Sequence, residues 1–509
     1  MNNIDYYRLS ICNSMKYMFN RLFFFVFLSF FGCVDAEKLP AQTTSSVLQD
    51  KIDKIAATDF YKHANLGISV RDVKTNEVIG QIEKDKMLVP ASTLKLITTL
   101  SGRDILGSDF RFETNLSYDG FVDTDGTLVG NIYIEGSGDP TLGSDRIKGN
   151  LNAEELFKKI ISDINAFGIT CIEGDVVADE SIFNSFPISP SWQWNDLGNY
   201  YAAGAWGLNI HENEYSIYFH RNGLIGSPTR IAYFKPFVPN LQLENEVTIG
   251  EPDSGDNAYI FGGPYHYGKR VVGTIPKGKN LFTVKGSLPD PPMYFSYRLM
   301  KEFEKLDMGG HTYRTLYQKD KKSQERKKII SYISSPLDEI IKLANERSIN
   351  IYCESVLKTI GLMKRDGGSG GEGIAAINEY MQGRNLDIRA MHLEDGSGLS
   401  TRNLVSPDFL TSFLSNYIKD KNIDEITRLI PRVGMEGTVK SLLVNSPAKG
   451  NMWVKSGSMD KILTYSGYCK AASGRYVAFS VFLNASTAKK KTENKAELEK
   501  ILDAIYRFS

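Results

Sequence analysis

One segment of the sequence places a serine and a lysine where they can act together. Ser92 and Lys95 lie three residues apart in LVPASTLKLITTL (88–100), whose apolar spacing predicts a helix that begins near the serine. Residues three apart on a helix share one face, so the lysine amine can reach the serine hydroxyl. Burial disfavours the charged ammonium, and a neutral amine can take the hydroxyl proton. The pair therefore predicts an acyl-transfer serine with a lysine base.

The context of Ser92 separates it from other matches to this spacing. A proline and a small residue precede it and an apolar helix follows, so it would lie at a helix N-terminus whose N–H groups favour a developing oxyanion. The spacing alone is not diagnostic, because Ser-x-x-Lys also occurs at Ser355, Ser446, Ser458 and Ser486. We take Ser92 as the candidate nucleophile because of the residues that precede it and the apolar helix that follows it.

Two further segments carry groups that suit the same chemistry. Ser348 and Asn350 stand where one predicted helix ends and the next begins, so a hydroxyl and an amide can line one cleft. Lys455, Ser456 and Gly457 lie on a predicted strand that can align a substrate backbone and bind its carboxylate, with the glycine leaving room for close approach. The order SxxK, SxN, K[ST]G is that of the penicilloyl-serine transferases.

The chain resembles the D-alanyl-D-alanine carboxypeptidase/endopeptidase family, also called the low-molecular-mass class C penicillin-binding proteins. The separation of 256 positions between Ser92 and Ser348 is typical of that family, in which β-rich domains are inserted there. The similar segments, which span nearly all the chain after its first residues, are VPASTLKLIT, GSGDPTL (136–142), GDVVADESIF (174–183), SINIYCESVLKTIG (348–361), DGSGLSTRNLVSP (395–407) and KSGSMDKILTYSGY (455–468).

The resemblance implies an acyl-enzyme mechanism on peptidoglycan stem peptides. Ser92 would attack the carbonyl between two D-alanines, Lys95 would be the base, and Ser348 and Asn350 would relay protons and orient Lys95. Water would then hydrolyse the acyl-enzyme, and β-lactam antibiotics would acylate Ser92 as covalent inhibitors by the same steps. The implied activity is serine-type D-Ala-D-Ala carboxypeptidase, DD-endopeptidase or both.

The resemblance also implies how the substrate is bound. Lys455 and Ser456 would hold the terminal carboxylate beside Gly457, and the backbone N–H groups of Ser92 and Ser458 would form the oxyanion hole. The family usually has threonine at position 456, and the serine keeps the hydroxyl.

Two more residues match positions near the family's substrate pocket. Asp179 is predicted to hold the amine of a diamino acid, and the alternative is a structural aspartate in a turn. Arg402 stands one position later than in relatives, after Thr401, so the preference for a peptide side chain stays open.

Two other functions remain compatible with this sequence. The first is a catalytically weak penicillin-binding scaffold protein, against which the intact Ser92, Lys95 and Lys455 argue. The second is a β-lactamase or esterase on the same core, against which the long insert argues. Labelling by a fluorescent penicillin of the wild-type protein but not of Ser92→Ala would support the family's chemistry, and equal labelling of both or of neither would contradict it.

The composition excludes several other classes. The 509 residues include 60 Lys+Arg and 60 Asp+Glu, so the formal net charge is zero and gives no reason to expect a nucleic-acid partner. With 42% hydrophobic and 24% charged residues, the chain is a globular protein rather than a disordered one. The six histidines are scattered, and neither a metal-ligand cluster nor a phosphate loop is present, so no metal or cofactor is expected.

The N-terminus predicts export. Residues 22–31 read LFFFVFLSFF after basic Arg21, which indicates a secretory signal within residues 1–36. Cys33 is the predicted lipidation site of a periplasmic lipoprotein, so contact with a membrane would come only through this anchor. Cleavage before Glu37, or a retained membrane anchor, are the alternatives.

The elements that must position these residues predict an α+β fold. An antiparallel sheet flanked by helices is expected to form a transpeptidase-like catalytic domain, interrupted by a β-rich insert of one or two small domains. The predicted elements include a short helix (47–57), a hairpin (67–73 with 77–83), helical periodicity near 287–306, a helix over 334–348 capped by Ser335, three strands after Trp453 and a last helix (494–507). The predicted divisions are a signal (1–36), a linker (37–46), the first catalytic part (47–111), the insert (112–286) and the second catalytic part (287–509).

Overall fold

A computed structural model describes residues 44–184, 186–318 and 325–509. The predicted signal segment, Cys33 and most of the predicted linker lie outside the described residues. Helix α1 (Thr44–Ala56) begins within the linker range and confirms the helix expected from residue 47. In the described ranges, every helix is too short or too polar to span a membrane.

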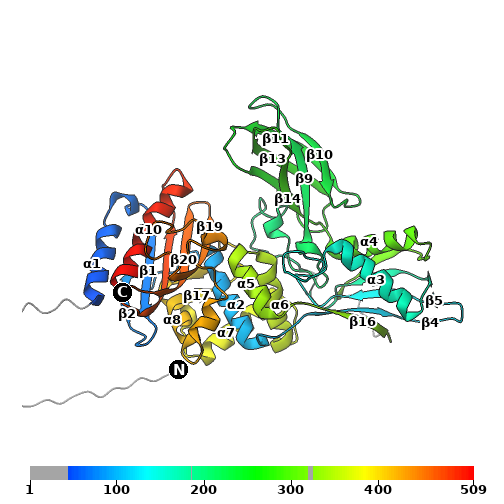
Figure 1. Cartoon of the computed structure of the whole chain (residues 1–509), viewed down its shortest axis with the longest axis horizontal. Helices are drawn as coiled ribbons and strands as arrows, with labels where there is room; N and C mark the ends of the chain where they lie inside the picture. The colour runs from blue at the N-terminus through cyan, green and yellow to red at the C-terminus, as the bar shows by residue number, and fades with distance from the viewer. Residues whose placement is uncertain (1–43, 185, 319–324) are drawn as a thin grey trace, which may run out of the picture. The chain divides into compact units, whose positions relative to one another are not determined.

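One antiparallel sheet joins the two ends of the described chain, in the order β19-β20-β21-β1-β2 (Figure 1). Strand β1 pairs with β21 from Asn65 opposite Asn484 to Asp72 opposite Val477. The N-terminal and C-terminal strands therefore share one sheet, and the rest of the chain lies between them in the sequence. The predicted hairpin and the three C-terminal strands are confirmed. The strands are β1 (Asn65–Asp72), β2 (Val78–Ile82), β19 (Met452–Met459), β20 (Ile462–Lys470) and β21 (Tyr476–Asn484).

The sheet buries both faces because successive side chains of β21 point to opposite sides. Phe479 and Val481 belong to a core shared with α1 and α10 (Lys491–Phe508), the two helices to the left of the strands in Figure 1. Phe482 belongs to a second core, shared with α2 (Lys95–Leu106) and α8 (Pro407–Ile418). The face that packs on α2 therefore supports the candidate nucleophile.

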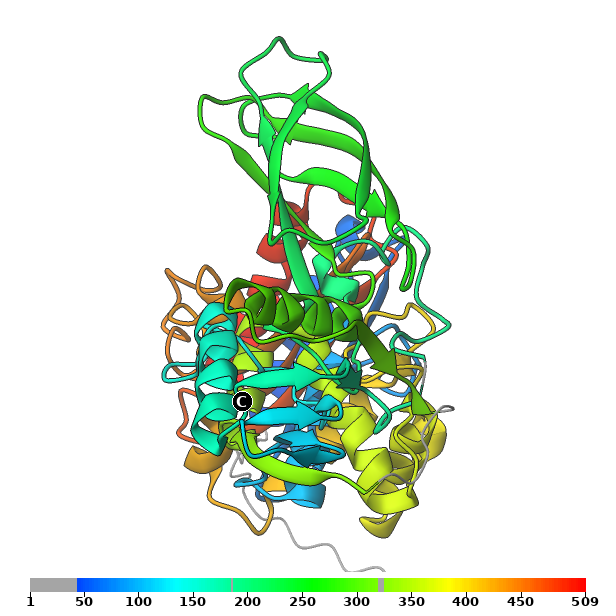
Figure 2. The ribbon, with the colours of Figure 1, turned by 90° about the vertical axis from the view of Figure 1, so that its right-hand side faces the viewer.

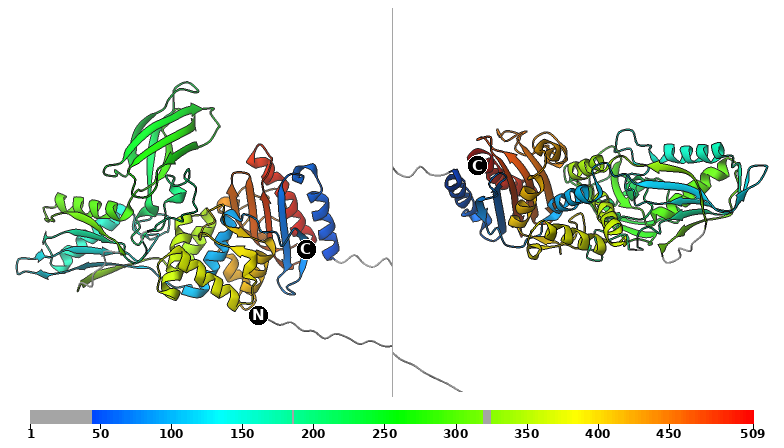
Figure 3. Two further views of the ribbon diagram at one scale, coloured as in Figure 1. Left: turned by 180° about the vertical axis from the view of Figure 1, so that it is seen from behind. Right: turned by 90° about the horizontal axis from the view of Figure 1, so that it is seen from below.

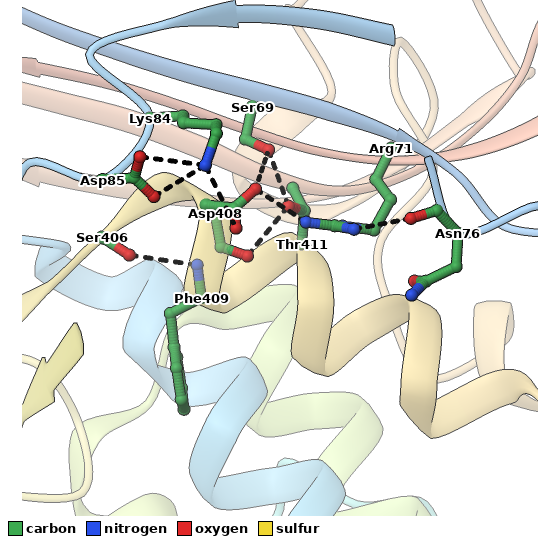
Figure 4. Close-up of polar contacts among 9 residues, drawn as sticks. All are labelled: Ser69, Arg71, Asn76, Lys84, Asp85, Ser406, Asp408, Phe409 and Thr411. Carbon is green, nitrogen blue, oxygen red and sulfur yellow. Dashed lines mark hydrogen bonds and ion pairs between the residues drawn. The ribbon is translucent and has the colours of Figure 1, made fainter. Parts of the chain in front are cut away.

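Helix α8 is tied to this sheet at its first turn (Figure 4). The Asp408 carboxylate lies 2.7 Å from Arg71 of β1 and 3.7 Å from Lys84, and Ser69 donates to it at 3.2 Å. Ser406 caps the helix by accepting the backbone N–H of Phe409. An acidic residue in the first turn also complements the helix dipole, so these contacts fix the position of α8 under the sheet.

Helices α5, α6 and α7 lie beside α2 on the side of the insert (Figure 3). The chain turns between α5 and α6 through Ser348, whose φ of 58° and ψ of 41° are left-handed. The expected cap of α5 is wrong by one residue, because Pro336 occupies the N-cap position and Ser335 donates instead to Asn150. The remaining elements of this part are α5 (Leu337–Arg347), α6 (Asn350–Arg365), α7 (Gly370–Gly383), α9 (Ile423–Thr427), β17 (Met391–His392) and β18 (Leu404–Val405).

The insert is rich in strands, as expected. Its largest sheet has the order β15-β8-β6-β3-β16 and packs against α4, which lies beside α3 (Figure 2). These elements are β3 (Glu113–Tyr118), β6 (Ile132–Glu135), β8 (Val176–Asp179), β15 (Tyr313–Leu316), β16 (Lys327–Ile333), α3 (Ala153–Phe167) and α4 (Pro291–Lys305).

Among its described residues, the insert also contains three smaller sheets, each of three strands. Their orders are β10-β9-β14, β11-β13-β12 and β4-β5-β7. Their bounds are β4 (Phe121–Val122), β5 (Thr127–Val129), β7 (Cys171–Glu173), β9 (Glu214–His220), β10 (Arg230–Lys235), β11 (Gln242–Gly250), β12 (Asn257–Phe261), β13 (Gly268–Pro276) and β14 (Phe282–Ser287).

The packing places the end of the insert later than residue 286. Helical periodicity returns at residue 287, which suggested the catalytic domain, but the helix found there is α4 and it packs on strands β8 and β15 of the insert. Strand β16 then pairs with β3, the first strand of the insert. We propose a boundary near residue 334, where β16 has ended and α5 follows.

Candidate active site

The candidate nucleophile lies on a tight turn that leads into a helix. Ser92 is half-buried in a 3₁₀ turn, Ala91–Leu94, and Lys95 is the first residue of α2. Ala91 has a φ of 45°, a conformation that non-glycine residues adopt rarely and at a cost. The Pro90 carbonyl accepts hydrogen bonds from the hydroxyls of Thr93 and Thr464, at 2.6 and 2.7 Å, and these hold the strained turn against β20.

The Lys95 amine contacts polar atoms from three parts of the chain. Its Nζ lies 3.0 Å from Ser92 Oγ, 2.6 Å from Asn350 Oδ1 and 2.6 Å from the backbone carbonyl of Ser397. The Asn350 amide nitrogen donates at 2.7 Å to the carbonyl of Tyr201, which can only accept. This contact fixes which end of the Asn350 amide faces Lys95, so the Asn350 oxygen is the acceptor.

Two of the three contacts suit the amine in either protonation state, because the carbonyl oxygens of Asn350 and Ser397 can only accept from Lys95. In the neutral form, these two acceptors leave the lone pair to face the Ser92 hydroxyl 3.0 Å away. Lys95 is fully buried, and this burial lowers its pKa, while the neighbouring Cys353, Asp395 and Glu354 oppose the shift. The geometry is that of a serine with its base in hydrogen-bond reach.

A second buried lysine lies next to the SxN segment. Lys455 Nζ donates to Ser348 Oγ at 3.0 Å and to the carbonyl of Ser456 at 2.7 Å. Its pKa lies well below that of a free lysine, first because it is fully buried and then because Lys95 repels its charge. The structure thus brings together Ser92, Lys95, Ser348, Asn350 and Lys455.

Strand β19 runs against the nucleophile turn. A Cβ added to Gly457 would lie 2.7 Å from the backbone nitrogen of Ser92 and 2.8 Å from the Pro90 carbonyl, so only glycine permits this approach. The Ser456 hydroxyl forms a hydrogen bond with the Thr438 hydroxyl at 2.7 Å, and Ser458, two residues later, is exposed. Lys455, Gly457 and the Ser92 amide therefore line one edge of the site.

The two pocket residues named from the family lie in other surroundings. The Asp179 carboxylate accepts from Arg326 at 2.6 Å and from the backbone N–H of Ser181 at 2.9 Å. Its charge is thus paired, which favours the structural alternative, and its role in holding an amine stays a prediction. Arg402 is exposed and lies 3.2 Å from Glu394, so its role also stays a prediction.

The insert reaches this site through contacts that the sequence did not reveal. Besides the Tyr201 carbonyl, the Trp192 indole donates to Asp395 at 2.8 Å and Ser189 donates to the Glu394 carbonyl at 3.0 Å. The only sequence signal was the run of aromatic residues in SWQWNDLGNYY (191–201), which says nothing about the partner. In the described part of the chain, His, Cys, Asp and Glu side chains form no group of three placed to hold a metal ion.

Comparisons with known proteins identify the family and the fold. The model of the D-Ala-D-Ala carboxypeptidase 3 (S13) family matches residues 48–505. The D-alanyl-D-alanine carboxypeptidase DacB of Haemophilus influenzae is 26% identical over 428 residues, which cover 83% of this chain and 85% of that protein. A D-alanyl-D-alanine carboxypeptidase of Actinomadura sp. (strain R39) is also 26% identical, over 464 residues that cover 86% of this chain and 81% of the relative.

A solved structure shows the same fold. The crystal structure of penicillin binding protein 4 from Haemophilus influenzae superposes with a TM-score of 0.75 at 24% sequence identity, covering 91% of this chain and 98% of that one. The same protein has been solved in complex with a novel β-lactam, and that structure gives a TM-score of 0.71 at 21% identity. The predicted α+β fold, with its interrupted catalytic domain, is confirmed.

Proposed function

The chain belongs to the D-Ala-D-Ala carboxypeptidase 3 (S13) family, and from this we propose that it is a serine-type D-Ala-D-Ala carboxypeptidase, DD-endopeptidase or both. Its substrates are peptidoglycan stem peptides, and β-lactams acylate it. One observation carries the serine mechanism: Lys95 Nζ lies 3.0 Å from Ser92 Oγ while two carbonyl oxygens occupy its N–H donors. A buried amine held in this way can act as a general base near neutral pH.

Acylation follows from this geometry. Lys95 removes the proton of Ser92, and Oγ attacks the carbonyl carbon of the bond between the two D-alanines. The oxyanion that forms is held by the N–H groups of Ser92 and Ser458, because β19 passes alongside the nucleophile turn at Gly457. The substrate's terminal carboxylate binds at Lys455 and Ser456, and its negative charge favours the ammonium form of Lys455 that burial alone disfavours.

Release of the first product needs a proton on the leaving amine. The carbon–nitrogen bond breaks as that amine takes the proton that Lys95 removed, with Ser348 as the relay. Lys455 Nζ holds the Ser348 hydroxyl at 3.0 Å and fixes its direction. Water then attacks the acyl-enzyme carbonyl and gives a proton to Lys95. The bond between the acyl carbon and Ser92 Oγ breaks, and Lys95 returns the proton to that oxygen.

A fluorescent penicillin tests the nucleophile directly. The wild-type protein is expected to become covalently labelled, and Ser92→Ala is expected to stay unlabelled at an unchanged melting temperature. Ser446→Ala is the matched control, because Ser446 belongs to another Ser-x-x-Lys match and is not one of the candidate site residues. Equal labelling of wild type and Ser92→Ala, or labelling of neither, refutes the proposal. Full acylation of Lys95→Met refutes the assignment of the base.

A digest of cross-linked muropeptides separates the two activities. Release of free D-alanine from pentapeptides reports the carboxypeptidase, and loss of cross-linked dimers reports the endopeptidase. A protein that is labelled by penicillin but leaves both substrates intact would be the scaffold alternative, and one that hydrolyses the penicillin rapidly would be the β-lactamase alternative.

We also propose that the protein is exported and anchored through lipidated Cys33, because an apolar run after a basic residue precedes that cysteine. Cys33→Ser is then expected to move the protein from the membrane fraction to the soluble periplasmic fraction. Soluble wild-type protein whose first residue is Glu37 would instead support the alternative cleavage site.

A further inference from the structure

The third partner of Lys95 is a backbone carbonyl supplied by a loop. Ser397 belongs to the loop 395–400, and its carbonyl takes one N–H of the Lys95 amine at 2.6 Å across 302 positions of sequence. The direction of the amine lone pair depends on both acceptors, because a neutral amine that loses one of them can turn away from Ser92. The position of the 395–400 loop therefore decides whether Lys95 faces the nucleophile.

Two helices hold this loop at the residue before Ser397. The backbone N–H of Gly396 donates to both oxygens of Glu354, at 3.1 and 3.2 Å. The carbonyl of Gly396 accepts from the Thr98 hydroxyl at 2.7 Å. Glu354 lies on α6 and Thr98 on α2, so the peptide groups on either side of Gly396 are fixed from opposite directions.

The loop is braced further along by Asp395. This buried carboxylate accepts from the backbone N–H groups of Gly398 and Ser400, at 2.7 and 2.6 Å, and from the Asn403 amide at 2.9 Å. The Trp192 indole of the insert donates to the same carboxylate at 2.8 Å. These bonds give the loop one conformation, and Glu354 sets where that conformation lies relative to α6.

Helix α6 carries both Asn350 and Glu354, four residues apart and therefore on one face. Asn350 contacts the Lys95 amine directly, and Glu354 acts through the loop. We propose that Glu354 is a positioning residue for Lys95, because its carboxylate holds the 395–400 loop so that the Ser397 carbonyl takes one N–H and leaves the lone pair to Ser92. This inference rests on the proposed function, in which Lys95 is the base.

The charge of Glu354 has a separate effect on the same amine. Glu354 is buried, and burial followed by the nearby Asp395 raises its pKa to about 7. When ionised it stabilises the ammonium form of Lys95, as do Asp395 and Cys353, whereas Lys455 opposes that form. Removal of this charge therefore lowers the pKa of Lys95. The acidic limb of the acylation rate, which is the pH range in which protonation of Lys95 slows acylation, then moves to lower pH.

The test compares acylation by a fluorescent penicillin in three full-length proteins from about pH 5 to about pH 9. Glu354→Gln is expected to acylate more slowly on its plateau, on the order of 10- to 100-fold, with the acidic limb shifted to lower pH. Glu354→Asp keeps the charge but is one methylene shorter, so its plateau falls while its limb stays in place. Glu379→Gln on α7, an exposed partner of Arg365, is the matched control and keeps the wild-type profile.

The proposal is overturned if Glu354→Gln keeps the wild-type plateau and limb. It is also overturned if the rate falls with an unmoved limb and a lower melting temperature, because that pattern belongs to a purely structural residue. Should Glu354→Gln fail to fold, Thr98→Val removes the opposite bond to Gly396, and a wild-type plateau in that variant refutes the role of the loop. Failure of wild-type protein to be acylated at all refutes the proposed function instead.

Discussion

At the residue scale, the site holds two lysines, Lys95 and Lys455, that are both fully buried. Burial lowers the pKa of each, and for Lys455 the nearby Lys95 lowers it further. The ammonium form is therefore disfavoured at both lysines, and a carboxylate bound beside Lys455 would favour the charged form of that amine. The pair also costs stability, because a buried ammonium has lost its water.

Lys455→Met is expected to raise stability and to abolish acylation by β-lactams and release of D-alanine. Replacing a buried ion pair by apolar side chains of similar volume is often neutral or stabilises proteins by about 1–4 kcal/mol, and removing a single buried ammonium likewise removes its desolvation cost. The pKa of Lys455 is lower in the folded protein than in the unfolded chain. The destabilisation caused by its buried charge is therefore complete below the folded-state pKa, and it disappears as the pH rises toward about 10.4, the pKa of an unfolded lysine.

Melting temperatures at several pH values measure this effect. The advantage of Lys455→Met is largest at the lowest pH at which the protein folds and shrinks as the pH rises. Lys342→Met, on the exposed side of α5, is the control and leaves stability nearly unchanged. A variant that melts below wild type in acid would show that Lys455 is held favourably as a cation.

The side chains of the site were predictable because each belongs to a short motif. Ser92 with Lys95, Ser348 with Asn350, and Lys455 each follow from spacing and from the element expected around them. The carbonyls of Ser397 and Tyr201 were not predictable, because any residue type supplies a carbonyl and only the fold decides which one faces Lys95. The sequence contained only a weak indication that Glu354 lies near the site, namely its position one helical turn after Asn350.

At the element scale, strand β19 and the nucleophile turn depend on each other. Thr464 on β20 holds the Pro90 carbonyl, and Gly457 lets β19 pass against the backbone of Ser92. The strand thereby brings Gly457 beside the Ser92 backbone and the Lys455 amine to the Ser348 hydroxyl. The turn that meets this strand is strained at Ala91.

Gly457→Ala is expected to separate β19 from the nucleophile turn. Its Cβ would lie 2.3 Å from Thr464 Oγ1 and 2.7 Å from the Ser92 nitrogen, so the strand or the turn must shift. We expect a loss of stability of about 1–3 kcal/mol from overpacking and a fall in acylation on the order of 100-fold.

Acylation rates and denaturant unfolding of the same variant give both quantities. Gly371→Ala is the control, because its Cβ in helix α7 has no neighbour nearer than 3.9 Å, and it is expected to stabilise by about 0.4–1 kcal/mol. If Gly457→Ala is acylated as fast as wild type, β19 does not set the geometry of the oxyanion hole.

Regular elements were predicted well where one periodicity dominated. The hairpin β1–β2, the three C-terminal strands and helices α1, α5 and α10 follow from alternation or from helical spacing. The cap of α5 was missed by one residue, since a proline and a serine at adjacent positions both suit a helix start. Helix α4 falls within the predicted second catalytic part (287–509) and packs on β8 and β15, because helical spacing shows that one face is buried but does not show which element covers it.

At the scale of the whole molecule, the insert contacts the catalytic part beside Lys95. Asn350 donates to the carbonyl of Tyr201 across 149 positions, and Trp192 donates to Asp395 across 203. The sequence placed these residues in different domains and gave no reason to join them. The long insert is therefore part of the support of the candidate site, and its length has a structural reason beyond the separation of two motifs.

The balance of charge over the chain leads to a prediction about salt. With 60 basic and 60 acidic residues, the protein has no net field that could steer an anionic β-lactam toward the site. In the proposed function, the carboxylate is recognised instead by buried Lys455, and buried charges are screened little by salt. The second-order rate constant for acylation should therefore change less than about twofold between about 0.05 M and about 0.5 M NaCl. Stopped-flow labelling with a fluorescent penicillin measures it. A fall of about tenfold would contradict this, because a change of that size requires long-range attraction from a cluster of exposed cations.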